Sequence, residues 1–318
     1  MTTFIESDIN TLKSSHDVKG ISKDEDFVSS CSNFICSTYA VFDGHGGKYL
    51  AKFLANGWED IPSFCQYICD KFIEFDGSIT TEDYIKQLFL EFDILLKKYH
   101  SGVIGSTATV CLIYQNKIYI AYVGDSKAMI VKDGSLVYQT LNHNCTENET
   151  ELERMQQANV VMSDCPNFVV KSDQEIQIIT SKYHNFSFHY LKDQVAISRA
   201  FGHFSVKAYQ KDAETENYTS QSALIVEPTV FSIPVEEGIE IIMASDGLWD
   251  MVKDFDDFNS VLIKAKETHP ENISEAFTEF AENRWKQEWS VLSDKPTFKT
   301  RMTHSIQWDD VSCYYLAF

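Results

Sequence analysis

Several short apolar runs in this sequence end abruptly at an aspartate, and this recurring pattern limits the folds open to the chain. The first run, residues 39–42, ends in Asp43, and a histidine follows within a glycine-rich turn. Residues of such runs favour β-strands, and glycine lets the backbone approach a ligand closely. The pattern predicts carboxylates at the end of a β-sheet. It recurs at residues 118–125 and 239–246, and in reverse order at residues 309–318.

Acids gathered at one sheet edge repel one another unless a cation lies between them. Carboxylate oxygens select hard cations such as Mg²⁺ or Mn²⁺ over zinc, which usually recruits His or Cys. Two such ions sharing Asp43 would lie roughly 3.5–4 Å apart, a spacing at which a bridging water loses its proton and attacks phosphorus. His45, on the same loop, is placed to protonate the departing oxygen. The residues therefore predict hydrolysis of a phosphate monoester.

Each of these signals also has a plain structural interpretation. An Asp-Gly pair after a strand is usually a turn. The three acids at residues 24–26 are, taken alone, more often a solvated turn, and a single histidine is more often structural. Only the joint occurrence of the acids at several strand ends favours a metal site.

Composition restricts the class of protein. With 318 residues, of which 44% are hydrophobic, the chain can bury a large core without disulfides. Its eight cysteines form no Cys-x-x-Cys pair, which indicates a reducing compartment, so we expect a cytoplasmic protein, with the nucleus as the alternative. The formal charge of -20 disfavours nucleic acid and anionic membranes. We expect a monomer without membrane insertion.

Secondary-structure signals favour antiparallel sheets with helices. Residues 33–42 form the first firm strand, and helices are expected at residues 48–58 and 81–100. Residues 105–131 hold strands joined by turns too short for parallel crossovers. After them come a short helix at residues 146–158 and largely helical residues 254–289.

We expect the chain to form a single domain. Residues 1–19 are polar and form an N-terminal extension, and residues 20–318 form a single catalytic domain. A mixed, polar insert at roughly residues 144–193 is expected to form a flap over that domain.

Six short motifs occur in a specific order along the chain: Val41–Gly47, Gly105–Ala108, Val123–Ser126, Ile197–Gly202, Ala244–Asp250 and Asp309–Ser312. Together this set resembles that of the metal-dependent protein phosphatase 2C family. The resemblance implies an α+β fold in which two antiparallel β-sheets pack as a central sandwich flanked by helices, a four-layer αββα arrangement with a flap insert. It also implies hydrolysis of phosphoserine and phosphothreonine in phosphoprotein substrates.

The resemblance also implies a role for each matching residue in a site with two Mg²⁺ or Mn²⁺ ions. Asp43 would bridge both ions, and His45 corresponds to the general acid of the family. The other implied metal-site residues are the Gly44 carbonyl at one ion, Asp246 and Asp309 at the other, Glu25 and Asp26 through metal-bound water, and Asp125, Asp246 and Asp250 at a weaker third ion.

Three departures from the family pattern bear on function. No arginine precedes the acidic pair to bind the substrate phosphate, and Lys23 or Lys19 is the available substitute, as a point charge without bidentate geometry. His203 stands where the family usually has aspartate, near the flap, and we expect it to titrate near neutrality. Asp310 stands where the family usually has asparagine.

The missing arginine motivates an alternative function, a pseudophosphatase that acts as a binding scaffold. Its weakness is that every matching metal carboxylate is present. A phosphatase for small molecules or lipids is a further alternative, because the metal site reads only the phosphate.

Overall fold

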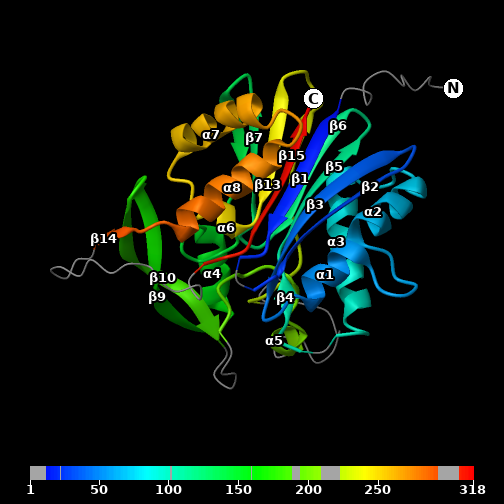
Figure 1. Cartoon of the computed structure of the whole chain (residues 1–318). Coiled ribbons are helices and arrows are strands. Elements are labelled where there is room, and N and C mark those ends of the chain that lie inside the picture. The colour runs from blue at the N-terminus through cyan, green and yellow to red at the C-terminus, as the bar shows by residue number, and fades with distance from the viewer. Residues whose placement is uncertain are drawn as a thin grey trace.

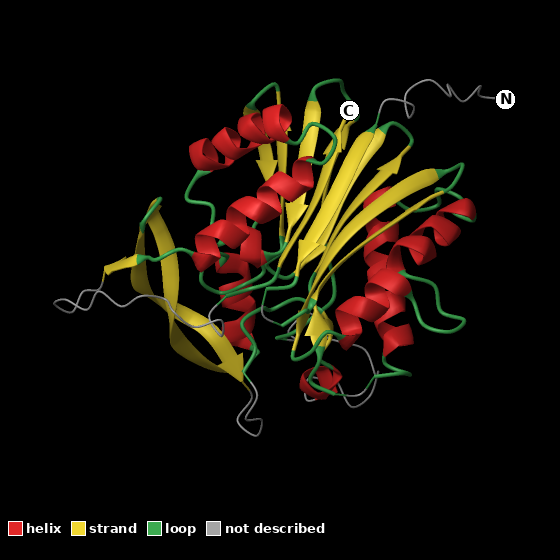
Figure 2. Ribbon diagram, viewed as in Figure 1, coloured by secondary structure: helices red, strands yellow, loops and turns green. Residues whose placement is uncertain are grey.

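Two β-sheets packed face to face form the centre of the computed structural model, and helices cover both outer surfaces (Figures 1 and 2). This architecture confirms the expected α+β sandwich of antiparallel sheets. The structure describes residues 12–21, 23–100, 102–158, 160–187, 194–208, 223–292 and 308–318.

The first sheet has seven strands in the order β11-β4-β3-β5-β6-β12, and β2 pairs with β3 beside this path. All of its pairings are antiparallel. Its strands are β2 (Asp26–Ser32), β3 (Cys36–His45), β4 (Gly105–Ser106), β5 (Ala108–Tyr114), β6 (Lys117–Val123), β11 (Phe201–Gly202) and β12 (Thr229–Pro234).

The second sheet has five antiparallel strands in the order β1-β15-β13-β7-β8. Its strands are β1 (Lys13–Lys19), β7 (Lys127–Lys132), β8 (Ser135–Gln139), β13 (Ile239–Ala244) and β15 (Val311–Ala317).

Alternating side chains of the central strands divide between two apolar layers, because successive residues of a strand point to opposite faces. In β3, Tyr39 and Val41 face the second sheet and join the core between the sheets, together with Ile241 and Met243 of β13. The neighbouring residue Phe42 faces the other way, toward the helices. This alternation fixes which face of each strand meets the opposite sheet.

Helices form the two outer layers. α1 (Tyr49–Asn56), α2 (Phe64–Ile73) and α3 (Thr81–Leu96) pack on the seven-stranded sheet. α6 (Asp246–Trp249), α7 (Phe255–Thr268) and α8 (Ile273–Lys286) pack on the five-stranded sheet. Helix α2 begins at a cap in which the Ser63 hydroxyl accepts the Gln66 N–H at 3.2 Å. Sequence analysis had not predicted this helix.

Two N-terminal strands correct the sequence analysis. Residues 13–19, expected to precede the domain, form β1, which pairs with β15 along its whole length. Residues 26–32, which precede the first expected strand, form β2 and pair with β3, so only Asp26 of the three acids in the favoured turn lies in a strand. Both strands are rich in polar residues, and β1 lies at a sheet edge with only one neighbour, so their apolar periodicity is weak.

The expected insert contains a helix and a hairpin. α4 (Glu149–Gln157) begins after Asn148 and is followed by β9 (Val161–Ser172) and β10 (Glu175–Ser187), which pair antiparallel. β14 (Ser290–Leu292) joins β10 in parallel to complete a three-stranded sheet. This sheet lies to one side of the sandwich (Figure 1). In the part of the chain that the structure describes, no helix combines the length and apolarity needed to cross a membrane.

A buried ion pair connects α3 to the short helix α5 (Phe204–Ala208). The Lys207 ammonium donates to Asp93 at 2.7 Å, and both side chains are 1% exposed. The other Asp93 oxygen accepts the Gly202 N–H at 2.8 Å. Burial raises the pKa of Asp93 and lowers that of Lys207, and their attraction offsets only part of this effect. Removing one partner therefore leaves an uncompensated buried charge.

We expect Lys207→Met to lower the free energy of unfolding by about 3–5 kcal/mol in urea denaturation, because Asp93 would lose its counter-ion. Lys86→Met is the control, since Lys86 pairs with Asp83 on the exposed surface of α3, and its loss should cost less than about 1 kcal/mol. Equal effects of the two substitutions would contradict this interpretation of the buried pair.

Candidate active site

Strand pairing brings the predicted acids to one end of the sandwich. Ala244, the last residue of β13, pairs with Lys127 at the start of β7 and with Cys313 of β15. Asp125 precedes β7, Asp246 follows β13 and Asp309 precedes β15, so the three acids lie at the same end of the sheet.

The seven-stranded sheet contributes two more acids. Asp26 and Asp43 are directly opposite each other on β2 and β3, and both are buried. The Ser245 hydroxyl donates to Asp26 at 2.6 Å and links the two sheets. The acidic cluster therefore consists of Asp26, Asp43, Asp125, Asp246 and Asp309.

Electrostatics show that these side chains influence one another. Burial, followed by the charges of Asp246 and Asp26, raises the pKa of Asp43 well above its usual range. Burial and the charge of Asp246 raise the pKa of Asp309 to about 6. Burial and the charge of Asp125 raise the pKa of Asp246 to about 6 as well. The charges of ionised neighbours thus raise the pKa values of these carboxyl groups, as expected for groups that would be stabilised by a cation.

The predicted residues around the cluster lie at different depths. Glu25 is half-buried, and its carbonyl accepts the Gly44 N–H at 3.1 Å. Asp250 follows α6 at the exposed rim, where desolvation and the charge of Asp246 raise its pKa. Lys19 pairs with Asp17 at 3.6 Å on β1. Of the two candidate lysines, only Lys23 contacts the cluster.

Lys23 is a cation in contact with the acidic cluster. Its ammonium lies 3.4 Å from Asp309 Oδ1, and its side chain is half-exposed. Partial burial lowers the pKa of Lys23, but the charges of Asp309 and Asp246 raise it more, so the net shift is upward. Lys23 therefore stays charged at neutral pH.

Asp43 is held by the Gly105–Ala108 motif. Its N–H donates to the Thr107 hydroxyl at 3.1 Å, and its carbonyl accepts the Thr107 N–H at 2.9 Å. The Thr107 hydroxyl also contacts that of Ser126 at 2.8 Å, which connects the Asp43 strand to the Asp125 loop. Sequence analysis identified the motif, but not this positioning role.

The donor set fits a hard divalent cation. All of its side chains are carboxylates, which magnesium and manganese prefer. Asp125 Oδ1 is buried and has no hydrogen-bond partner within the described residues, so a buried acceptor is available for a ligand. Among the same residues, no three His, Cys, Asp or Glu side chains are grouped as a ready ligand set. The acids thus interact electrostatically, and their roles as ligands stay predictions.

Two histidines lie beside the cluster. The His45 and His203 rings are 6.1 Å apart. His203 packs against Gly105, where an added Cβ would lie 2.1 Å from the ring. Burial and the charge of His45 lower the pKa of His203 to about 3, so the expectation that it titrates near neutrality is wrong. Burial also lowers the pKa of His45, to about 4.

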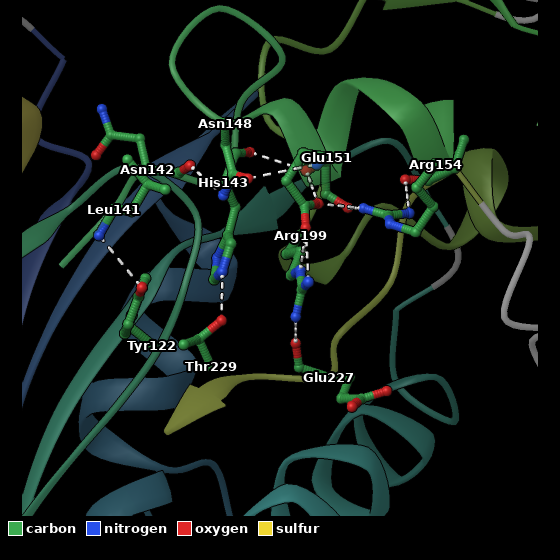
Figure 3. Close-up of polar contacts among 12 residues, drawn as sticks. Tyr122, Leu141, Asn142, His143, Asn148, Glu151, Arg154, Arg199, Glu227 and Thr229 are labelled. Atoms are coloured by element: carbon green, nitrogen blue, oxygen red, sulfur yellow. Dashed lines mark hydrogen bonds and ion pairs between the residues drawn. The ribbon is translucent and has the colours of Figure 1, made fainter. Parts of the chain in front are cut away.

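A polar network, absent from the sequence-based prediction, joins α4 to the sandwich (Figure 3). Arg199 donates to Glu151 Oε1 through Nε at 3.0 Å and Nη2 at 2.6 Å, and through Nη1 to the Glu227 carbonyl at 2.9 Å. Arg154 and the Ser198 hydroxyl donate to the other Glu151 oxygen. The sequence signal that could have indicated this network was Arg199, which lies in the recognised motif Ile197–Gly202 but had no role assigned to it.

Glu151 is the centre of this network. It is 1% exposed, and burial alone would raise its pKa, but the hydrogen bond from Arg199 and the charges of both arginines lower it to about 2. Nearby, His143 Nε2 contacts the Thr229 hydroxyl at 2.9 Å (Figure 3). The Nδ1 atom of His143 accepts the Gly124 N–H at 3.2 Å. The network therefore attaches the flap next to the loop that carries Asp125.

Comparison with known proteins agrees with the motifs. The family model for protein phosphatase 2C matches residues 24–287. The chain belongs to the protein phosphatase 2C family. Among curated relatives, probable protein phosphatase 2C 55 of Oryza sativa subsp. japonica is 29% identical over 259 residues, which cover 78% of this chain and 54% of that protein. Probable protein phosphatase 2C member 13, mitochondrial, from the same plant, is 25% identical over an alignment that covers 78% of this chain and 56% of that protein. The chain spans little more than half the length of these relatives.

Solved structures of this phosphatase 2C fold match nearly the whole chain. A serine-threonine phosphatase 2C from Toxoplasma gondii aligns with a TM-score of 0.63 at 14% identity and covers 96% of this chain and 94% of that one. A C. elegans sex determining protein aligns with a TM-score of 0.63 at 20% identity and covers 96% of this chain and 64% of that one. At these identities the likeness establishes the fold.

The raised pKa of Asp125, about 6, predicts a pH-dependent stability difference. From about pH 4 to 6 the folded state keeps a proton that the unfolded state releases, so ionisation of Asp125 costs stability as pH rises. In EDTA, Asp125→Asn should therefore raise the free energy of unfolding by about 1–2 kcal/mol at pH 7.5.

The difference between Asp125→Asn and the wild type should nearly vanish at about pH 4, where Asp125 is protonated in the folded state. Denaturation curves at the two pH values measure it. A stability difference of the same size at both would show that Asp125 does not have the raised pKa.

Proposed function

We propose that this phosphatase 2C chain hydrolyses phosphoserine and phosphothreonine in proteins with two Mg²⁺ or Mn²⁺ ions. The observation that carries the proposal is the acidic cluster, whose members come from five chain segments and raise one another's pKa values. Ionised carboxylates so arranged cost stability, and a divalent cation would offset that cost. We also propose a monomer in the cytoplasm or nucleus.

The resemblance to the family assigns these carboxylates to different ions. Asp43 would be shared by both ions, with the Gly44 carbonyl at one ion and Asp246 and Asp309 at the other. Glu25 and Asp26 would act through water, and Asp125, Asp246 and Asp250 would hold a weaker third ion. When bound, the ions would supply an acidified water and would neutralise charge on the substrate phosphate.

His45 would transfer a proton to the departing oxygen of the substrate. It lies on β3 two residues after Asp43, and the charge of Asp309 raises its pKa while burial lowers it. A phosphate dianion bound next to the ring would favour the protonated form further, since an opposite charge stabilises the imidazolium. A larger fraction of His45 would thus be protonated when substrate is bound.

Lys23 would contact the substrate phosphate. Its ammonium reaches the cluster at Asp309 and stays charged at neutral pH. A lysine makes point-charge contacts, whereas an arginine can bind two phosphate oxygens at once. Weaker phosphate binding than with an arginine is therefore expected.

The alternative function, a pseudophosphatase scaffold, is favoured by one observation. No arginine precedes the acidic pair, and the available substitute, Lys23, forms an ion pair with Asp309, so the phosphate contact has a competing partner. Turnover assays with a phosphopeptide at millimolar Mn²⁺ separate the two functions. A wild-type protein that binds Mn²⁺ without releasing phosphate would support the scaffold.

We expect Asp43→Asn to reduce kcat/KM for a phosphothreonine peptide by at least about a thousandfold, because the residue proposed to be shared by both ions would lose its charge. EDTA should have the same effect on the wild type. Asp133→Asn, in the exposed turn between β7 and β8, is the matched control and should retain full activity. Retained turnover in Asp43→Asn would contradict the proposal.

Lys23→Arg should lower KM for an aryl phosphate several-fold, because a guanidinium can contact two phosphate oxygens. Lys23→Ala should raise KM by about tenfold with a smaller change in kcat, since it removes one charged contact. Steady-state kinetics in saturating Mn²⁺ measure both. Unchanged KM in both variants would show that residue 23 does not contact the phosphate.

A further inference from the structure

Asp310 makes an unusual set of contacts with the main chain. Its side chain is buried, at 1% exposure, beside the acidic cluster. Its Oδ1 accepts the N–H groups of Ile21 at 2.8 Å and Lys23 at 3.2 Å, and its Oδ2 accepts the Glu25 N–H at 2.8 Å. One carboxylate therefore binds three alternate residues of the segment that carries the phosphate-contacting lysine.

The carboxylate is chemically suited to these three contacts. Both of its oxygens are acceptors, and hydrogen bonds to a charged acceptor are stronger than neutral ones. Three donors also stabilise a charge that burial would otherwise disfavour. An asparagine has one acceptor oxygen and an NH₂ group that donates. At residue 310, that NH₂ group would face either the Glu25 N–H or the N–H groups of Ile21 and Lys23.

The bound segment is connected to the site in two ways. The Lys23 side chain extends to Asp309, the residue next to Asp310. The Glu25 carbonyl accepts the Gly44 N–H at 3.1 Å, next to Asp43. Displacing the segment from Asp310 would therefore move both the lysine and the contact at Gly44.

The main chain of Asp310 is itself held in place by Gly247 and Asp309. A Cβ added to Gly247 would lie 1.9 Å from the Asp310 carbonyl oxygen, so the two backbones are in close contact. The Asp310 N–H donates to Asp309 Oδ1 at 2.9 Å. The main chain of Asp310 is thus fixed, and its carboxylate can orient the N–H groups of Ile21, Lys23 and Glu25.

We propose that Asp310 is a positioning residue for phosphate binding, whose carboxylate holds the main chain of Ile21, Lys23 and Glu25 so that the Lys23 ammonium faces the substrate phosphate. The inference rests on the proposed function for the role of Lys23. It also assigns a purpose to the aspartate that this chain has in place of asparagine.

The test measures Asp310→Asn by amide hydrogen exchange and by calorimetric titration of inorganic phosphate in the presence of Mn²⁺. Exchange in a peptide covering residues 20–26 should accelerate by at least about tenfold, because the three N–H contacts cannot all be kept. The dissociation constant for phosphate should rise by about tenfold. Asp17→Asn is the control, since Asp17 of β1 accepts the hydroxyl of Thr278 on α8 and not a main-chain N–H of the bound segment, and it should change neither measurement.

A double-mutant comparison separates positioning from general destabilisation. If Asp310 acts through Lys23, then Asp310→Asn should not weaken phosphate binding further once Lys23→Ala is present. Unchanged exchange in Asp310→Asn, or an equal loss of phosphate affinity with and without Lys23, would overturn the inference. A wild-type protein that binds phosphate but does not turn over substrate would refute the proposed function, whereas coupled losses of exchange protection and affinity would still support the role of Asp310.

Discussion

Repulsion among carboxylates at one end of the sandwich is the constraint on which the rest of the structure depends. Burial raises the pKa values of the acidic cluster, and each charge raises those of its neighbours. The fold tolerates this cost because the strands that carry the acids are fixed by two apolar layers. The Asp43 N–H donates to the Thr107 hydroxyl and the Ser245 hydroxyl donates to Asp26, and these bonds fix the two acids locally. The core therefore supplies the rigidity that lets the site remain electrostatically unfavourable without a ligand.

A second kind of polar contact connects peripheral segments to that core. Glu151 accepts hydrogen bonds from Arg154 and Arg199 and so attaches the flap helix. Asp93 accepts hydrogen bonds from Lys207 and from the Gly202 N–H and so attaches β11 and α5, on either side of His203. In each case, a buried acid binds a charged side chain from a distant part of the sequence. Apolar packing builds the sandwich, and buried acids attach the segments that surround the site.

Sequence analysis predicted the sandwich and the acidic residues because both follow from local patterns. Apolar runs of strand-forming residues ended at Asp43, Asp125 and Asp246, and the structure places these residues at one end of the sandwich. Strand β1 was missed because an edge strand with polar residues has weak periodicity. The burial of His203 could not be predicted, since it depends on the space left by Gly105. The three N–H contacts of Asp310 join segments nearly 290 residues apart, so no local pattern indicates them.

Ala244 pairs with Lys127 on one side and with Cys313 on the other, and these two pairings restrict where chain length can vary in homologous sequences. An added residue in β13 would shift Asp246 by about 3.3 Å relative to its neighbours and turn the following side chains to the opposite layer. At the other end of the same strands, the turn before Ile239 carries no member of the cluster. Insertions and deletions among homologues should therefore accumulate at that end, and an alignment could locate the catalytic end of the domain from gap positions alone.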